Sequence, residues 1–492
     1  MSRNPESHAE SHDVREVDVV VVGMGAAGCA AAVTAHDAGA TVLVLEKAAA
    51  AEAGGNTRVS GGGWFHHDDP ERAAIYLRSL CGDRPLPEPV VHAWAHGTRE
   101  VSRWVESLGV SVGPNGNYNA TGAEYPEMPG SDCYGGLYCV DGVVGDGRLF
   151  AALEKALFER GISVHYDSPA SGLITEPASG EVTGVVTAAG DRILARRGVV
   201  LATGGFEGDP ELVRTHLGLD DAPVWGSVAA TGDGLRMAQE AGADLWHMDN
   251  MMAVNGITEP GSRHGYFAMF LYSRGVLWVD ETGRRFVDEF VPSGHGQALI
   301  DGRYVLHPQR PMWVIFDEHT RLAGPISPSA DVLAVGWNVL MNGYRWSSDN
   351  SAEIAAGWIH RGDTLDELAS LTGFPGDALN DSVSAYNAAC AAGDDGDFGR
   401  SPATLVPILE PPFYAYRSGP LLGWTNGGPR RDEHARVLDT AGAVIEGLYA
   451  AGTVSSTFSW AKDGGFHIAD AIVFGRAAGE HAAGRSRRNP EH

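Results

Sequence analysis

The sequence predicts an α/β protein with a Rossmann-like dinucleotide-binding domain and a second domain that is inserted or appended. Three observations support this fold class. A valine-rich segment near the N-terminus runs into a glycine fingerprint, 65 glycines suit a protein with many tight turns between strands and helices, and the 492 residues are enough for two or three hydrophobic cores.

The segment VDVVVVGMGAAGCAAAVTAHDAGATVLVLEK contains the first three elements. Residues 17–22 form a continuous β-branched run, which is typical of a parallel strand buried on both faces. Residues 26–38 have helical composition and end at Gly39. Residues 41–45 are a second apolar run, so the order is strand, helix, strand.

A GxGxxG fingerprint lies between the first strand and the helix. Gly23 permits the turn, Gly25 lets the backbone approach a pyrophosphate, and Gly28 allows the helix to pack closely. The helix N-terminus then offers amide donors and a partial positive charge to the phosphates. Glu46 follows the second strand, where an acid is suited to hold the ribose hydroxyls.

Three further segments are rich in glycine or follow a buried strand. GGNTRVSGGGWF spans residues 54–65, LATGGF contains Thr203, Gly204 and Gly205, and LYAAGTV lies near the C-terminus. Glycines in such segments let the backbone run against a flat, rigid ligand. No second strand-associated GxGxxG is present, so we expect one bound dinucleotide.

Charge and composition exclude several partners. The formal charge of −27, from 36 basic and 63 acidic residues, disfavours nucleic acid and anionic membranes and favours a small-molecule substrate. The five cysteines have no metal-like spacing, so we expect reduced thiols and no metal. Residues 1–16 are predicted to be a disordered tail without signal-peptide character, and no apolar run reaches about 18 residues. We therefore expect a cytoplasmic protein.

The motifs occur in an order that resembles flavoproteins of the fumarate reductase, succinate dehydrogenase and 3-ketosteroid dehydrogenase superfamily. They are VVGMGAAG, EK...GGNTRVSGGG, LATGGF, ATGDGLRMAQEAGA, GVLWVDETGRRFVDE, RPMWVIFDE, TLDELA and EGLYAAGTV...DGGFHIADAIVFGRAAGE. The resemblance implies an FAD-binding domain in two sequence blocks, residues 17–252 and 361–492. It also implies an inserted α+β cap domain, residues 253–360, over the flavin.

The resemblance also implies which residues contact FAD. They are Gly23, Gly25, Ala26, Ala27, Gly28, Glu46, Lys47, Gly55, Asn56, Thr57, Ser60, Gly61, Gly62, Ala170, Thr203, Gly204, Gly205, Asp233, Gly452, Thr453, Gly465, His467 and Ile468.

The segment WAKDGGFHIADAIVFGR places two glycines where a helix should begin, at a cost of about 1 kcal/mol per glycine inside a helix. In the family the matching glycines lie against the pyrimidine edge of the isoalloxazine. We therefore expect side chains at 464 and 465 to collide with the ring. The helix from Phe466 then directs its N-terminus at the edge that becomes negative on reduction, with backbone amides from His467 and Ile468.

Departures from the family narrow the chemistry. Asn56 stands where covalently flavinylated members that dock an iron-sulfur partner carry histidine, so we expect non-covalent FAD and no such partner. Fumarate-reducing members clamp carboxylates with two arginines, and Ser293 and Lys462 occupy those places here. Because lysine lacks the planar fork of arginine, a small dicarboxylate fits poorly.

His295 and Lys462 are the predicted catalytic residues, because the proton-transferring tyrosines of the ketosteroid branch are also missing. Histidine titrates near neutral pH, and burial lowers the pKa of a lysine toward that range. A solvent-exposed His295 and a surface Lys462 are the alternatives. Tyr138, Trp424 and Trp460 are predicted to line the substrate pocket, with core packing as the alternative.

The predicted function is an FAD-dependent oxidoreductase that adds or removes hydrogen across a C–C bond next to a carbonyl. An apolar substrate is preferred, such as a steroid or a secondary metabolite, with an electron acceptor that the sequence does not specify. The alternatives are a reductase of a small unsaturated acid, a non-redox flavin-dependent hydratase or isomerase, and an electron-transfer module.

Overall fold

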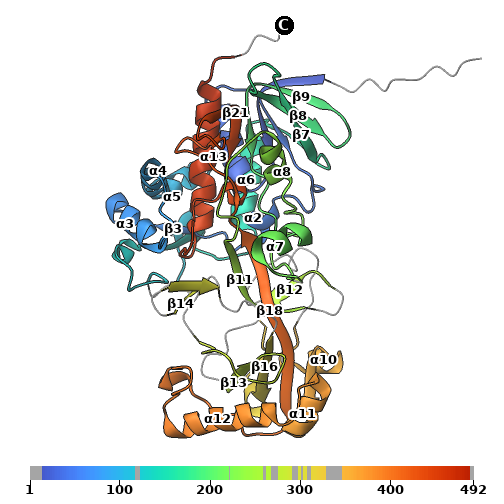
Figure 1. Cartoon of the computed structure of the whole chain (residues 1–492). Helices are drawn as coiled ribbons and strands as arrows, with labels where there is room; N and C mark the ends of the chain where they lie inside the picture. The colour runs from blue at the N-terminus through green and yellow to red at the C-terminus, as the bar shows by residue number, and fades with distance from the viewer. Residues whose placement is uncertain are drawn as a thin grey trace, which may run out of the picture.

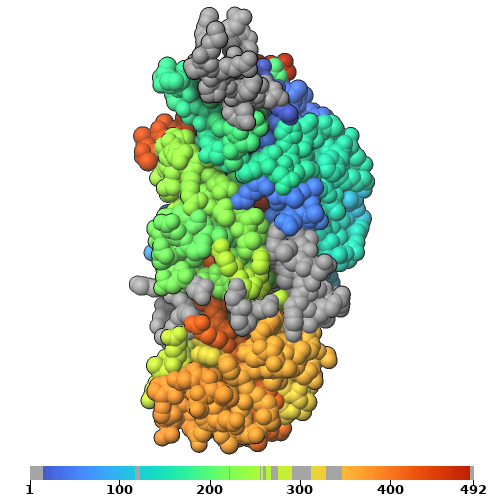
Figure 2. Space-filling model, turned by 90° about the vertical axis from the view of Figure 1, so that its right-hand side faces the viewer, coloured from blue at the N-terminus to red at the C-terminus, as the bar shows by residue number. Residues whose placement is uncertain are grey.

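The computed structural model describes residues 14–116, 122–220, 222–258, 262–267, 275–290, 297–300, 303–306, 312–327 and 346–487. The molecule is elongated, with a large sheet and its helices at one end and a smaller sheet with its helices at the other (Figure 1). Figure 2 shows the same outline after a quarter turn, with orange residues that follow 346 forming the lower end.

The larger sheet has eight strands in the order β20-β21-β9-β1-β2-β6, and β7 and β8 continue it from β9. β1 pairs in parallel with β2 and β9, and residues 19–22 of β1 are buried, as expected for a strand covered on both faces. The strands are β1 (Val14–Val22), β2 (Val42–Leu45), β6 (Ser163–His165), β7 (Ala170–Thr175), β8 (Val182–Thr187), β9 (Arg192–Leu201), β20 (Arg436–Leu438) and β21 (Val444–Ala450).

Two helices, α1 (Ala26–Asp37) and α13 (Phe466–Gly484), pack closely against each other. A Cβ added at Gly475 would lie 2.4 Å from the carbonyl oxygen of Ala27, and one at Gly479 would lie 2.3 Å from that of Ala31. Glycine is therefore required at both positions, because the backbones of the two helices approach each other closely there. Further helices at this end of the molecule are α2 (Gly55–Val59), α6 (Arg148–Glu159), α7 (Pro210–Leu217) and α8 (Asp233–Glu240), and α8 packs on the face of the sheet opposite to α1.

A helical layer lies beside α13 and carries a small sheet in the order β3-β5-β4. Its core contains Phe65, Tyr76 and Trp94, which pack around Phe466 at the start of α13. The elements are β3 (Trp64–His66), β4 (Val112–Pro114), β5 (Gly136–Val140), α3 (Pro70–Leu80), α4 (Glu88–Arg99) and α5 (Val101–Glu106). Further short elements are β10 (Leu245–Trp246), which pairs with β19 (Gly428–Pro429), and 3₁₀ turns at Ser131–Cys133, Pro402–Thr404 and Thr453–Ser455.

The second sheet has the order β12-β11-β18-β16-β13, and β17 also pairs with the long strand β18. Its strands are β11 (Met251–Thr258), β12 (Gly265–Phe267), β13 (Val276–Val279), β16 (Met312–Asp317), β17 (Ile359–Gly362) and β18 (Phe413–Thr425). Its helices are α9 (Glu318–Leu322), α10 (Ser351–Ala355), α11 (Leu365–Thr372) and α12 (Ala378–Ala392), and a hairpin is formed by β14 (Gln297–Ile300) and β15 (Arg303–Leu306).

The observed packing differs from two expected boundaries. Residues 361–425, which we expected to return to the FAD-binding domain, belong to the second sheet: Leu368 of α11 and Tyr386 of α12 share a core with Ile315 and Ala415. Helical periodicity identifies α11 and α12 as helices, but it does not identify the sheet that they cover. Residues 14–16, expected in the tail, pair with β9 from Arg192 onward.

Candidate active site

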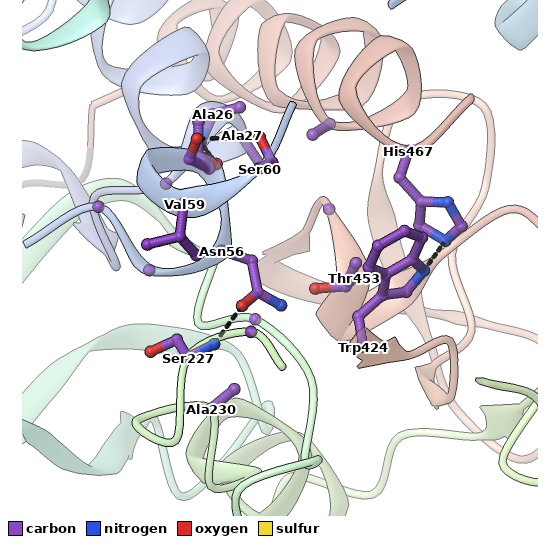
Figure 3. A pocket seen from close by; sticks show the side chains of 18 of the residues that line it. Ala26, Ala27, Asn56, Val59, Ser60, Ser227, Ala230, Trp424, Thr453 and His467 are labelled. Carbon is purple, nitrogen blue, oxygen red and sulfur yellow. Dashed lines mark hydrogen bonds between the residues drawn. The ribbon is translucent and has the colours of Figure 1, made fainter. Parts of the chain in front are cut away.

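A cavity of about 890 Å³ lies between the two sheets. Its wall combines the β1–α1 turn and the start of α13 with Met252 and Val254 of β11 and Trp424 of β18 (Figure 3). The predicted FAD contacts that line it are Gly23, Gly25, Ala26, Ala27, Glu46, Lys47, Gly55, Asn56, Thr57, Ser60, Gly61, Gly62, Ala170, Thr203, Gly204, Asp233, Gly452, Thr453, Gly465, His467 and Ile468. The structure therefore brings together segments from both ends of the chain.

Two predicted FAD contacts, Gly28 and Gly205, lie behind the wall. A Cβ at Gly28 would lie 1.9 Å from the carbonyl oxygen of Gly23, so this glycine serves the packing of α1 on the turn, as the fingerprint predicts. A Cβ at Gly205 would lie 2.2 Å from Thr425 Oγ1. Gly205 thus allows β18 to approach the turn after β9.

Both long helices begin at the cavity without a side-chain cap. Gly25 is the N-cap of α1 and Gly465 that of α13, and neither position offers a side-chain acceptor to the first amides. The Ala26 amide donates to Thr57 Oγ1 at 2.8 Å. Uncapped first turns present N–H groups and partial positive charge, which suits anionic groups. The cavity also receives the buried Thr203 Oγ1, which has no hydrogen-bond partner in the described part of the chain.

Polar side chains after β2 are held in place by the protein. Glu46 accepts from the Met24 amide at 3.1 Å and from the Ala48 amide at 2.9 Å. Lys47 Nζ lies 2.8 Å from Asp233 Oδ2 and donates to Thr231 Oγ1 at 2.8 Å. The carboxylate of Glu46 is fixed at the cavity, and the charge of Lys47 is already paired.

Asn56 connects the glycine-rich segment to β18. Its Nδ2 donates to Glu207 at 2.8 Å and to the Gly423 carbonyl at 3.2 Å, and its Oδ1 accepts from the Ser227 amide at 2.5 Å. Glu207 is 1% exposed, and burial raises its pKa to about 7. Thr425 supplies two further donors to Glu207. Asn56 is therefore a fixed part of the cavity wall.

The glycine at position 465 has a reason that differs from the expected one. Its φ is +79°, and an added Cβ would lie 2.4 Å from the backbone nitrogen of Phe65 in β3. The side chain would therefore collide with the protein, so contact with the flavin ring is not needed to explain this glycine. The helix after it begins at Phe466, as predicted.

Of the two predicted catalytic residues, Lys462 and His295, the structure describes only Lys462. Lys462 is fully buried, does not line the cavity, and donates from Nζ to the Met251 carbonyl at 3.3 Å. Burial lowers its pKa to about 7, and the negative charge of Glu124 acts in the opposite direction. Its catalytic role remains a prediction. His295 and Ser293 lie outside the described residues.

Of the predicted substrate contacts, Trp424 lines the cavity and the other two do not. Its Nε1 donates to His467 Nε2 at 2.9 Å. Tyr138 stacks on His66 with ring centroids 4.0 Å apart, and Trp460 packs against the guanidinium of Arg84. Both rings contact protein neighbours, and a substrate-binding role for Tyr138 and Trp460 stays a prediction.

Two carboxyl groups at the cavity, those of Asp463 and Glu124, are not among the residues predicted from the sequence. Asp463 is 1% exposed and accepts from the Tyr76 hydroxyl at 2.6 Å, the Glu124 amide at 3.0 Å and the Gly464 amide at 2.6 Å. Asp463 directly precedes the paired glycines, and this position in the sequence could have identified it as a cavity residue. Glu124 lies in a segment without regular structure, where no sequence pattern marks it.

The part of the cavity nearest the second sheet is apolar. Met252 and Val254 form a small core with Leu421, and Trp225 and Trp424 pack against it. Among the described residues that line the cavity there is no arginine, and Lys47 is the one lysine. This part of the wall therefore offers apolar surface, and no described residue of the cavity offers the planar fork of arginine.

The fold and the cavity define an α/β dinucleotide-dependent oxidoreductase. The family model described as "FAD binding domain" matches residues 18–465, and the chain belongs to this family. The uncapped helices, the glycine cradle and the fixed Glu46 fit FAD. The protein is thus an FAD-dependent oxidoreductase, of the class that acts on CH–CH bonds.

Named relatives have related activities. The chain is 29% identical to vinyl phenol reductase of Lactiplantibacillus plantarum, over 95% of this chain and 96% of the relative. It is 28% identical to fumarate reductase (cytochrome) of Shewanella frigidimarina, over 97% and 78%. The structure of 3-ketosteroid delta1-dehydrogenase from Sterolibacterium denitrificans, in complex with 1,4-androstadiene-3,17-dione, is similar with a TM-score of 0.78, 25% identity, and coverage of 95% and 99%.

The cysteines and the apolar helices can be compared with the expectations drawn from composition. All five cysteines are free thiols, and four of them are buried. Within the described ranges, no helix is both long and apolar enough to cross a bilayer.

Proposed function

We propose that the protein adds or removes hydrogen across a C–C bond next to a carbonyl group of an apolar, ring-containing substrate. The observation that carries this proposal is the apolar wall of Trp225, Trp424, Met252 and Val254 at the end of the cavity near the second sheet. Burial of a ring against such a wall is favourable by about 25 cal/mol per Å² of apolar surface.

Electrostatics argue against the alternative of a small unsaturated dicarboxylate. Asp463 and Glu124 contribute carboxyl groups to the cavity, and the ammonium of Lys47 is paired with Asp233. A dicarboxylate would meet the negative charge of Glu124 without the bidentate partner that arginine provides. A neutral ketone or enone meets no such penalty.

The residues that line the cavity suggest how FAD is held without a covalent bond. The α1 N-terminus and the fingerprint would hold the pyrophosphate, Glu46 would accept from the ribose hydroxyls, and the α13 N-terminus would stabilise negative charge on the flavin ring. Bound FAD supplies or accepts the hydride. We also propose that the larger sheet forms the FAD-binding domain and that the second sheet, with α11 and α12, forms the cap.

The names of two relatives support a ring-containing substrate. One relative is a vinyl phenol reductase, and another was solved with 1,4-androstadiene-3,17-dione. The S. frigidimarina relative is a fumarate reductase and represents the alternative.

Anaerobic flavin spectroscopy tests the proposal. A cyclic saturated ketone is expected to bleach the oxidised flavin, or a cyclic enone to restore the colour of the chemically reduced enzyme. Fumarate, added at the same concentration, is the comparison. Faster recolouring with fumarate would favour the unsaturated-acid reductase, and no response to any of these compounds would favour a non-redox role.

A further inference from the structure

The loop before α13 presents a buried carboxyl group to the cavity. Both oxygens of Asp463 accept hydrogen bonds: Oδ2 from the Tyr76 hydroxyl and the Glu124 amide, and Oδ1 from the Gly464 amide. Three donors from three separate segments hold the group in one orientation. This degree of fixation is what proton transfer to a bound substrate requires.

The groups around Asp463 favour a proton on it near neutral pH. Burial and the Glu124 carboxylate raise the pKa of Asp463 to about 8, whereas its hydrogen bonds act in the opposite direction. Tyr76 contacts it from α3, and Cys133 and Tyr134 interact with it electrostatically from the 3₁₀ turn Ser131–Cys133 and its end. Burial raises the pKa of each of these three groups. Lys462 precedes it in the chain and has its own electrostatic contact with Glu124.

Glu124 is a second acid next to Asp463 and is more accessible to solvent. It lines the same cavity and is only partly buried, and its backbone amide contacts Asp463 directly. An acid at the cavity, next to a second and more accessible acid, is the arrangement needed for repeated protonation.

We propose that Asp463 is the residue that transfers the proton in the proposed reaction, that Tyr76 positions it, and that Glu124 exchanges the proton with water. The inference rests on the proposed function. In reduction of an enone, the O–H bond of Asp463 breaks and a C–H bond forms at the α-carbon, while the hydride from the reduced cofactor forms the C–H bond at the β-carbon and the π bond is lost. In dehydrogenation the Asp463 carboxylate removes the α-proton and becomes protonated, the β-hydrogen leaves as hydride to the oxidised cofactor, and the C=C bond forms.

The first test compares Asp463→Asn and Tyr76→Phe with the parent enzyme. Asp463→Asn is expected to retain FAD and to slow flavin reduction by a saturated ketone by about 10²- to 10⁴-fold. Tyr76→Phe keeps the carboxyl but removes a hydrogen bond that lowers its pKa, so the pH profile of dehydrogenation is expected to move to higher pH. Tyr386→Phe is the matched control, because it removes one hydrogen bond of a buried tyrosine on α12 that does not line the cavity.

The second test uses apoprotein and is independent of turnover. In the folded protein Asp463 binds a proton up to pH about 8, whereas its ordinary pKa is 3.8. Its contribution to stability is therefore lost as pH rises from about 4 to about 8. Asp463→Asn is expected to remove this dependence. The thermal midpoint of the variant should therefore rise relative to that of the parent as the pH increases from about 4 to about 8.

The outcomes separate the two proposals. A parent enzyme that reacts with no ketone or enone contradicts the proposed function. A reactive parent with Asp463→Asn at the parent rate contradicts the role of Asp463. An identical pH dependence of stability in both apoproteins contradicts the buried, protonated state on which that role depends.

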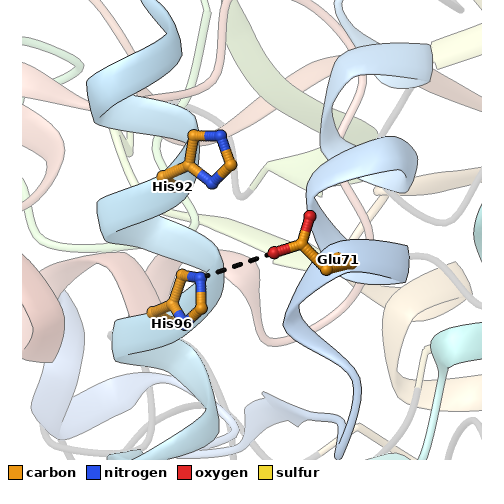
Figure 4. Close-up of side chains that lie close together, drawn as sticks. All are labelled: Glu71, His92 and His96. Carbon is orange, nitrogen blue, oxygen red and sulfur yellow. Dashed lines mark ion pairs between the residues drawn. The ribbon is translucent and has the colours of Figure 1, made fainter.

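An independent observation concerns the outer surface of α3 and α4. His92 and His96 lie four residues apart on α4, and Glu71 lies opposite on α3 (Figure 4). Their ligand atoms lie within 4.8 Å of one another, and His96 Nε2 is 3.8 Å from Glu71 Oε1. Buried residues between the helices, including Ala74, Leu77 and Val91, keep the two backbones in place.

The geometry points to a site for a divalent transition-metal ion such as Zn²⁺, with water completing its coordination. Two imidazoles and one carboxylate are ligands that Zn²⁺ accepts at about 2.0 to 2.2 Å, and small rotations of these exposed side chains bring the atoms to that range. A bound ion would connect α3, which carries Tyr76, to α4.

Zinc titration of the FAD-loaded protein tests the site. We expect Zn²⁺ to bind to the parent and to raise its thermal midpoint, and both effects to be lost in the double variant His92→Gln, His96→Gln. His36→Gln, which changes an exposed histidine on α1, is the control. Equal zinc affinity in the double variant and the parent would overturn the assignment.

Discussion

Folding buries the amino group of Lys462 completely. Its pKa in the folded protein is about 7, below the ordinary 10.5, so the unfolded chain binds more protons between these values. Parent stability therefore rises with pH across this range. Each unit of this pKa difference corresponds to about 1.4 kcal/mol, and the variant also loses the hydrogen bond to Met251. We therefore expect the free energy of unfolding of Lys462→Met to exceed that of the parent by about 2 to 4 kcal/mol at pH 7.

Chemical denaturation at several pH values measures this gain. It should be largest below pH 7 and disappear above about 10.5, because the parent lysine is then neutral in both states. A gain that is the same at all pH values would show that the charge of Lys462 is not its cause.

The predicted catalytic role of Lys462 has a separate test. If the ammonium acts electrostatically on the reacting groups, Lys462→Met retains FAD but slows flavin reduction by about 10²-fold, and Lys462→Arg recovers part of the rate. Stopped-flow absorbance measures both rates. Parent rates in both variants would contradict a catalytic role for Lys462 and leave it as a buried residue behind the cavity wall.

Asn56 bears on whether FAD is attached covalently to the protein. Its amide is held by Glu207, Gly423 and Ser227, and an amide does not form the histidyl linkage. We expect acid or heat precipitation to release all FAD into the supernatant. Flavin fluorescence that stays with the washed polypeptide would contradict non-covalent binding, and would direct attention to His467 on the same cavity.

At the scale of elements, the start of α1 makes a direct prediction. A Cβ at Gly25 would lie 3.3 Å from Thr57 Oγ1, and the additional methyl groups of Gly25→Val would enter the space proposed for the pyrophosphate. The purified variant should be largely colourless. Absorbance of FAD per polypeptide measures the loss, and a circular dichroism spectrum like that of the parent shows that the fold is retained.

Gly39→Ala is the comparison for that variant. Gly39 follows the same helix at its other end and has no neighbour within 4 Å of an added Cβ, although its φ is +85°. It should lose some stability and keep its FAD. Full occupancy in Gly25→Val would mean that the fingerprint does not hold the cofactor.

Local sequence patterns predicted the elements that hold the cofactor, because each one carries its own signal. The valine run, the fingerprint and the alanine-rich helix appear as β1, the turn and α1, and α13 begins at Phe466. The assignment of α11 and α12 to the second sheet depends on contacts with Ile315 and Ala415, which are distant in sequence. Asp463 and Glu124 were missed for the same reason, since the tertiary fold alone brings them together.

At the scale of the whole molecule, only some elements of each sheet and its helices line the cavity. The second sheet contributes Met252, Val254, Gly423 and Trp424, which lie on β11 and β18 near the larger sheet. None of the described residues of β13, β16, α11 or α12 lines it. Their core around Ile315 and Leu368 is separate from the cavity.

This separation predicts where removal of FAD changes hydrogen exchange. Amides of the β1–α1 turn, the glycine-rich segment 54–62 and the first turn of α13 should exchange faster in the apoprotein, because the ligand that stabilises them is lost. Amides within α12 should exchange at the same rate in both forms, because their hydrogen bonds and core are independent of the ligand. Mass spectrometry of peptides from the two forms measures both sets, and faster exchange of equal size in α12 would show that the whole molecule depends on FAD as one cooperative unit.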